Sequence, residues 1–150
     1  MKNIFTPEVT SGVIARINKL NPDSKPTWGK MSAAQVMAHC CVTYEMEYEK
    51  IHPKPNAILR FMLKTFVKNA VVSEKPYKKN GQTAPQFIIK DEKVLKDEKS
   101  RLIKYIEKTQ RLGEAHFDGK ENVSFGKLNK KQWSNLFYKH LDHHLSQFGV

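Results

Sequence analysis

Most of this chain repeats its apolar residues every three or four positions, and residues that start or stop helices bound these stretches. Ser32 and Asn129 each stand three residues before a glutamine, a capping-box pattern in which the two side chains satisfy each other's free backbone N–H groups. No stretch alternates apolar and polar residues as a half-buried strand does. The pattern therefore predicts an all-α protein without strands.

The apolar periodicity predicts helices over residues 7–20, 33–50, 56–71, 96–112 and 130–148. The stretch 56–71 is apolar over a wide arc, and Gly113 is predicted to cap the fourth helix. Proline, glycine and charged residues interrupt the pattern over 72–87 and 114–128, which are predicted as loops. A length of 150 residues suits one domain, residues 1–150, folded as a four-helix bundle with an extra helix or a long loop.

The net charge of +11 comes from one part of the chain. Residues 52–111 hold 15 basic and 6 acidic residues, whereas the segments on either side are nearly neutral. Nucleic-acid binders usually combine arginines and aromatic residues on one face, but here most of the basic residues are lysines, often next to acids, as in residues 96–99. The pattern favours a solvated surface or the rim of a site for an acidic small molecule. Binding to an anionic polymer is kept as an alternative.

Three sequence features bear on where in the cell the protein is located. The first residues lack the apolar stretch of a secretory signal, and no apolar run approaches the ~20 residues of a membrane span. The two cysteines, Cys40 and Cys41, are adjacent, which makes them poor disulfide partners within a helix. We therefore expect a cytoplasmic protein without membrane contact.

Three of the six histidines lie in one five-residue stretch, 140–144, inside the last predicted helix. At ~100° per residue, His140, His144 and Gln147 fall on one line of its apolar side, and His143 falls at the edge. On the second helix, His39 also faces the core. Imidazoles at positions i and i+4 are spaced to share one metal ion, and unpartnered burial of two histidines would cost several kcal/mol.

These observations predict a metal site formed by His39, His140 and His144. Three neutral histidines leave a coordination position open for water or a substrate, as in a catalytic site. The alternative is that the three are core residues hydrogen-bonded to one another, to carbonyls or to water. His52 and His116 are predicted in loops, and Cys40 is weighed as a zinc ligand or a nucleophile, both with less support.

Two segments carry a resemblance to a known family: Trp28–His39, and the segment from Trp133 to Gly149 with its pattern His-x-x-x-His-x-x-Gln. They are similar to the first and the last motif of the DinB/YfiT-like metalloenzyme superfamily. The ending Lys-His-Leu-Asp-His-His is closest to a DinB-related bacterial family of unknown function. Residues 123–126, Val-Ser-Phe-Gly, depart from the His-Pro-x-Phe-Gly-like loop of the superfamily, so no site residue is expected from them.

The resemblance implies a bundle in up-down-down-up order with a divalent metal, zinc or nickel, on His39, His140 and His144. His143 is a neighbour of these ligands that is typical of the superfamily; the resemblance assigns it no role, and support of the ligands is a hypothesis for it. Relatives include thiol-dependent transferases and an isomerase that uses a low-molecular-weight thiol, which implies a metal that activates a thiol or water. The predicted function is a metal-dependent transferase or hydrolase, and the alternative is a non-catalytic small-molecule or metal-binding bundle. A small-molecule substrate is expected, and a homodimer is left open.

Overall fold

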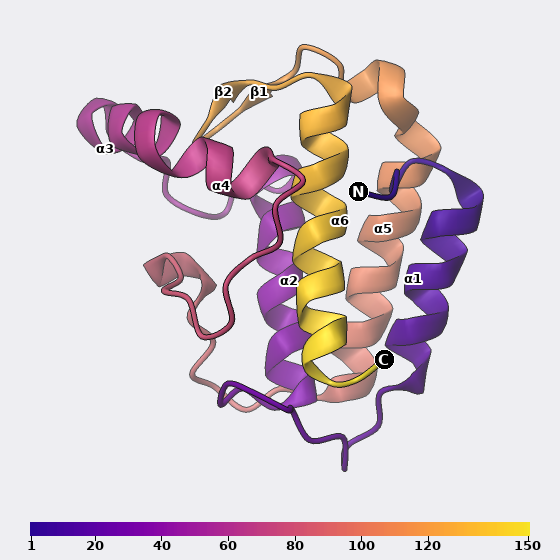
Figure 1. The fold of residues 1–150 in the computed structure, drawn as a ribbon. Coiled ribbons are helices and arrows are strands. Elements are labelled where there is room, and N and C mark those ends of the chain that lie inside the picture. The colour runs from indigo at the N-terminus through magenta and orange to yellow at the C-terminus, as the bar shows by residue number, and fades with distance from the viewer.

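The computed structural model describes all 150 residues, and Figure 1 shows four long helices packed side by side. They are α1 (Pro7–Lys19), α2 (Ala33–Tyr48), α5 (Leu95–Phe117) and α6 (Lys130–Gln147). Helices α1 and α6 run in one direction and α2 and α5 in the other, which is the up-down-down-up order (Figure 1). The prediction of an all-α four-helix bundle is confirmed.

Because α2 and α5 are parallel, a long connection must return the chain to the end at which α2 began. The connection holds α3 (Ala57–Met62), a π-helical turn (Leu63–Val67), α4 (Lys68–Val72) and a 3₁₀ turn (Pro85–Phe87). We call residues Ala57–Val72 the arm. Both the extra helix and the long loop predicted from the sequence are therefore present, in the same crossover.

Both predicted capping boxes form, and they set the starts of the two helices that carry the histidines. The Ser32 side chain accepts from the Gln35 N–H at 3.2 Å, and the Asn129 side chain accepts from the Gln132 N–H at 2.9 Å. In each pair the glutamine side chain accepts from the backbone N–H of the capping residue, at 3.0 Å. The helical register of α2 and α6 is thus fixed by local hydrogen bonds.

The prediction of a plain loop over residues 114–128 was wrong. Gly113, with φ of +72°, leaves the helical conformation where it was predicted to cap the helix, but a second helical segment follows this kink and α5 ends at Phe117. The chain then forms a hairpin of two short antiparallel strands, β1 (Glu121–Asn122) and β2 (Gly126–Lys127). Strands of two residues are too short to produce the alternation by which a sequence indicates a strand.

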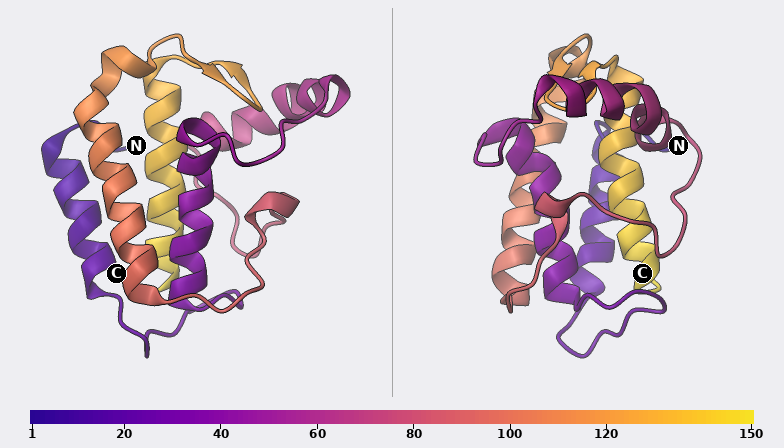
Figure 2. Two further views of the ribbon diagram at one scale, coloured as in Figure 1. Left: turned by 180° about the vertical axis from the view of Figure 1, so that it is seen from behind. Right: turned by 90° about the vertical axis from the view of Figure 1, so that its left-hand side faces the viewer.

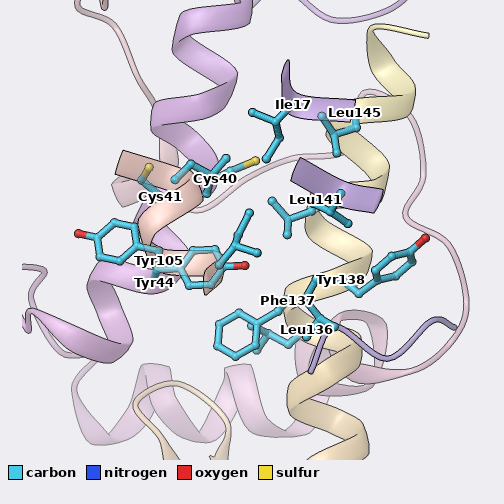
Figure 3. Close-up of a cluster of buried hydrophobic side chains, with 14 of the residues drawn as sticks. Ile17, Cys40, Cys41, Tyr44, Tyr105, Leu136, Phe137, Tyr138, Leu141 and Leu145 are labelled. Atoms are coloured by element: carbon cyan, nitrogen blue, oxygen red, sulfur yellow. The ribbon is translucent and has the colours of Figure 1, made fainter. Parts of the chain in front are cut away.

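The core lies between the four long helices, and Figure 3 shows part of it. The ring of Tyr44 stacks on Tyr105 and on Phe137, with centroid distances of 5.7 and 4.9 Å. Helix α2 is buried on nearly every side because α5, α6 and the returning crossover surround it, and so both Cys40 and Cys41 are fully buried (Figure 3). None of the helices combines the length and the apolar character needed to cross a bilayer.

Candidate metal centre

The three predicted histidines meet between α2 and α6. Each offers one ring nitrogen, and these nitrogens all lie within 4.8 Å of one another. The closest pair is Nε2 of His39 and Nε2 of His140, at 2.9 Å. The rings of His140 and His144 are 5.0 Å apart between centroids, as expected of residues one turn apart on a single helix. Helix geometry alone brought two of these side chains together, and the packing of α2 on α6 added the third.

The remaining nitrogen of His39 is held by the crossover. Its Nδ1 lies 2.8 Å from the carbonyl oxygen of Phe87, which can only accept, so Nδ1 carries the proton and donates. The neutral ring then has its lone pair on Nε2, the atom that faces His140. A metal-binding histidine is usually oriented in this way, by donating its other N–H to a carbonyl or a carboxylate.

His144 is oriented by a chain of two hydrogen bonds. Nε2 of Gln147 donates to the carbonyl oxygen of Trp28 at 2.6 Å, which turns the amide oxygen toward His144. The Nδ1–H of His144 donates to that oxygen at 2.9 Å. His144 therefore also has its lone pair on Nε2. Gly29, at φ of +79°, makes room for this arrangement, since a Cβ there would lie 2.5 Å from Nε2 of Gln147.

His140 is the histidine whose proton can occupy either nitrogen. Its Nδ1 lies 3.0 Å from the hydroxyl oxygen of Thr43, which can donate or accept. If the hydroxyl donates, His140 carries its proton on Nε2 and donates to His39. If the hydroxyl accepts, the proton lies on Nδ1 and all three histidines present a lone pair. The second state requires a cation to relieve the contact between the lone pairs of His39 and His140.

Burial keeps the three rings neutral. His39 and His144 are 3% and 8% exposed, and desolvation lowers the pKa of His39 below its ordinary value. Desolvation, reinforced by His39 and His143, lowers the pKa of His144 to about 3. The pKa of His140 is also lowered well below its ordinary value, first by desolvation and then by the neighbouring histidines. A neutral imidazole is the form that binds a metal.

The donor set fits a divalent transition metal. Three imidazoles without a carboxylate suit zinc, nickel, copper or iron and do not suit magnesium or calcium, which prefer oxygen. No acidic side chain belongs to the group. Three protein ligands are also fewer than the four of a closed structural zinc site.

His143 lies outside the group of ligands. Its ring is 5.0 Å from that of His144, 5.6 Å from Tyr77 and 5.9 Å from Trp28, measured between centroids. The ammonium group of Lys79 lies 4.2 Å from the centre of the Trp28 ring, and its charge contributes, after burial, to a lowered pKa of His143. His143 thus lies among aromatic and basic side chains next to the three histidines.

The other candidate residues are not part of this site. Nε2 of His52 lies 2.6 Å from the buried Glu45, and Nε2 of His116 accepts from Nζ of Lys120 at 2.9 Å. Desolvation raises the pKa of Cys40 well above its ordinary value and that of Cys41 to about 12, so both thiols stay protonated. A nucleophilic or zinc-binding Cys40 is not supported, because both roles need the thiolate.

Residues 123–126 connect the two strands of the hairpin. These are the residues that depart from the His-Pro-x-Phe-Gly-like loop of the superfamily that the sequence resembles. The hairpin precedes α6, and His140 lies ten residues into that helix, about 15 Å along its axis. This loop therefore contributes nothing to the three-histidine group.

Sequence reasoning missed three groups that shape the site. Two are the carbonyl oxygens of Trp28 and Phe87, which carry no side-chain signal. The third is Lys139, 2% exposed, whose Nζ donates to the carbonyls of three residues at the end of the arm and just beyond it: Ala70, Ser73 and Lys75. From the sequence, a lysine next to the first histidine of the motif is expected to be exposed to solvent. Only the tertiary packing shows that it is buried.

The fold and the site define a helical bundle with a neutral three-histidine cluster between its second and last long helices, in which His39 and His144 are buried and His140 is half-buried. Residues 6–149 match the profile of a family described as a protein of unknown function, DUF1569. The match spans nearly the whole chain, and the chain belongs to this family. Comparison with curated proteins and comparison with solved structures each gave no match.

Proposed function

We propose that this protein is a metal-dependent enzyme in which His39, His140 and His144 bind one divalent cation. The observation that carries the proposal is the pair of hydrogen bonds at Nδ1 of His39 and of His144. Each bond fixes the ring so that its basic nitrogen points into the cluster. Two lone pairs aimed at a third histidine in a buried place are unfavourable unless a cation or a proton lies between them.

The chain itself supplies orientation and exclusion of water. Phe87 and Gln147 hold the rings of His39 and His144, and burial favours the neutral imidazoles over the charged ones. A divalent cation, when bound, lowers the pKa of a thiol or a water molecule and so provides a nucleophile at neutral pH. The resemblance to DinB/YfiT-like metalloenzymes supports zinc or nickel as the metal and a low-molecular-weight thiol as the group activated. The proposed reaction is a thiol-dependent transfer or a hydrolysis.

The surroundings of His143 favour an acidic small molecule as substrate. Lys79 stands over Trp28, and both neighbour His143. A cation held against an aromatic ring offers charge for a carboxylate and an apolar face for the rest of the molecule. A screen of paired acidic and neutral compounds tests this, and better turnover of the neutral members contradicts it.

A second candidate function has its own supporting observation. If Thr43 donates to Nδ1 of His140, then Nε2 of His140 donates to His39, and all the ring nitrogens of His39 and His140 are satisfied without a metal. The cluster would then be a polar part of the core in a non-catalytic binding protein. The two candidates differ in whether the protein takes up metal.

Metal content measured by plasma mass spectrometry, on untagged protein purified without a nickel column, tests the proposal. We expect close to one equivalent of one divalent metal, or uptake of one equivalent of zinc or nickel after treatment with a chelator. The double variant His140→Ala/His144→Ala should bind none, and His116→Ala, outside the cluster, should bind as the wild type does. Less than a tenth of an equivalent, with no uptake of zinc, nickel, manganese or iron(II), would refute the proposal and leave the second candidate.

A further inference from the structure

The arm carries the largest group of exposed apolar side chains in this protein. Six of the eleven large apolar residues that are exposed belong to it: Ile58, Leu59, Phe61, Met62, Phe66 and Val67. Ile58 is 75% exposed and Phe66 is 73% exposed, and no residue from 57 to 71 is buried. Figure 2 shows α3 pointing away from the bundle. A short helix of this kind is only marginally stable until its apolar side is covered.

The polar side of the arm, in contrast, faces the protein. Arg60 forms an ion pair with Glu121, and Nζ of Lys68 donates to the carbonyl oxygen of Lys127 at 3.1 Å. These contacts join the arm to the β1–β2 hairpin, and the cleft between them is lined by basic residues from both sides, together with Glu121 and Phe61. An ordinary surface helix buries its apolar side and exposes its polar side. The arm does the reverse, so its apolar side is free to meet a partner.

The exposed side is continuous in space. Ile58, Met62 and Phe66 follow one another at intervals of four residues, which in a regular α-helix would drift by ~40° per step. The π-helical turn over Leu63–Val67 winds less per residue, which offsets this drift and returns Phe66 toward the side of Ile58. The result is one apolar stripe along the arm rather than a spiral.

Charge decides which partner fits this stripe. From Lys50 to Ser73 the chain has four lysines, one arginine and no acidic residue. In a symmetric dimer through this face, two such segments would meet with the same sign of charge and without acidic residues to pair with. The surface of an anionic bilayer provides both an apolar layer for the stripe and negative headgroups for the basic residues.

We propose that the arm docks on the surface of anionic lipid membranes, with its apolar stripe in the interface and the exposed lysines of this segment, Lys50, Lys54 and Lys64, at the headgroups. A helix lying in the interface needs no membrane-spanning segment, so the absence of one does not conflict with the proposal. The inference replaces the expectation from the sequence that the chain makes no membrane contact. It is independent of the metal centre, since the arm supplies none of the three histidines.

Co-sedimentation of the full-length protein with vesicles tests the proposal. We expect binding to vesicles of phosphatidylcholine and phosphatidylglycerol in a 7:3 ratio, little binding to phosphatidylcholine alone, and loss of most binding at 0.5 M NaCl. The variant Ile58→Gln/Phe66→Gln should lower the partition coefficient at least tenfold. The control Ile88→Gln/Val94→Gln changes two other apolar residues, 51% and 63% exposed, and should stay within twofold of the wild type. Because all four positions are exposed, circular dichroism and thermal unfolding should be unchanged.

Three results would overturn the proposal. The first is absence of binding to the anionic vesicles at low salt, and the second is equal loss of binding in the arm variant and the control. The third is a wild-type dimer, measured by light scattering without lipid, that Ile58→Gln/Phe66→Gln converts to a monomer. That result would assign the stripe to a second copy of the chain.

Discussion

The substitution Gln147→Met tests how the site is oriented. Gln147 is 3% exposed and joins His144 to the carbonyl of Trp28 by two hydrogen bonds. Methionine has a similar length and removes both bonds. Removing a residue that orients a metal-binding histidine typically costs 10- to 100-fold in metal affinity, which is about 1.4 to 2.7 kcal/mol. Without metal, the unpaired Nδ1–H of His144 should lower the free energy of unfolding by about 1 to 3 kcal/mol.

The variant Gln147→Glu separates the two effects. Its carboxylate can still accept from Nδ1–H of His144, but it cannot donate to Trp28. In this variant we expect a zinc affinity within a few-fold of that of the wild type. We expect its loss of stability to be similar to that of Gln147→Met. Competition with a chromophoric chelator measures the affinity, and urea unfolding in EDTA measures the stability. Wild-type zinc affinity in Gln147→Met, or an equal loss of affinity in both variants, would refute the reasoning.

Four further outcomes are expected. Gly29→Ala should lower both stability and zinc affinity without touching a ligand, because its Cβ would displace the side chain of Gln147; isothermal titration with zinc checks this. Thr43→Val should weaken zinc binding on the order of tenfold, and Thr43→Ser should restore it, by the same titration. In metal-free protein, His144 has a pKa of about 3 when folded and about 6.5 when unfolded. The contribution of His144 to the free energy of unfolding is therefore complete above pH 6.5 and is lost on acidification toward pH 3, at about 1.4 kcal/mol per pH unit. In urea unfolding at pH 7, 6 and 5, the free energy of unfolding should therefore fall less steeply with decreasing pH in His144→Gln than in the wild type. Lys139→Met should speed amide exchange over residues 70–77 on the order of tenfold, since three carbonyls there lose their donor; unchanged exchange by mass spectrometry would contradict this.

The helices could be predicted because their signals are local. Ser32 and Asn129 set the starts of α2 and α6 through hydrogen bonds that span three residues, so no distant part of the chain was needed. The hairpin after α5 could not be predicted, since its two strands are paired across a turn and are each two residues long. The extra turn after Gly113 was missed because a capping glycine ordinarily ends a helix.

The candidate site divides in the same way. The spacing of His140 and His144 predicts that they share one face of a helix, and the core-facing position of His39 predicts that it joins them. The groups that fix the two rings lie instead in segments far away in the sequence. Phe87, in the crossover after the arm, accepts directly from Nδ1 of His39, and Trp28, in the loop before α2, holds Gln147, the partner of His144. Backbone carbonyls are the same in every residue, so no sequence pattern marks the two that orient the histidines.

The sequence by itself therefore determined the all-α class, the boundaries of most helices and the three residues of the cluster, because helical hydrogen bonds and side-chain spacing act within a few residues. Only the tertiary structure decided the tautomers of His39 and His144, the burial of Lys139 and the side of the arm that faces solvent. Each of these depends on which distant segment packs against the element. The apolar arc of residues 56–71 shows the difference, since the helix formed as its pattern predicts and its apolar side faces outward.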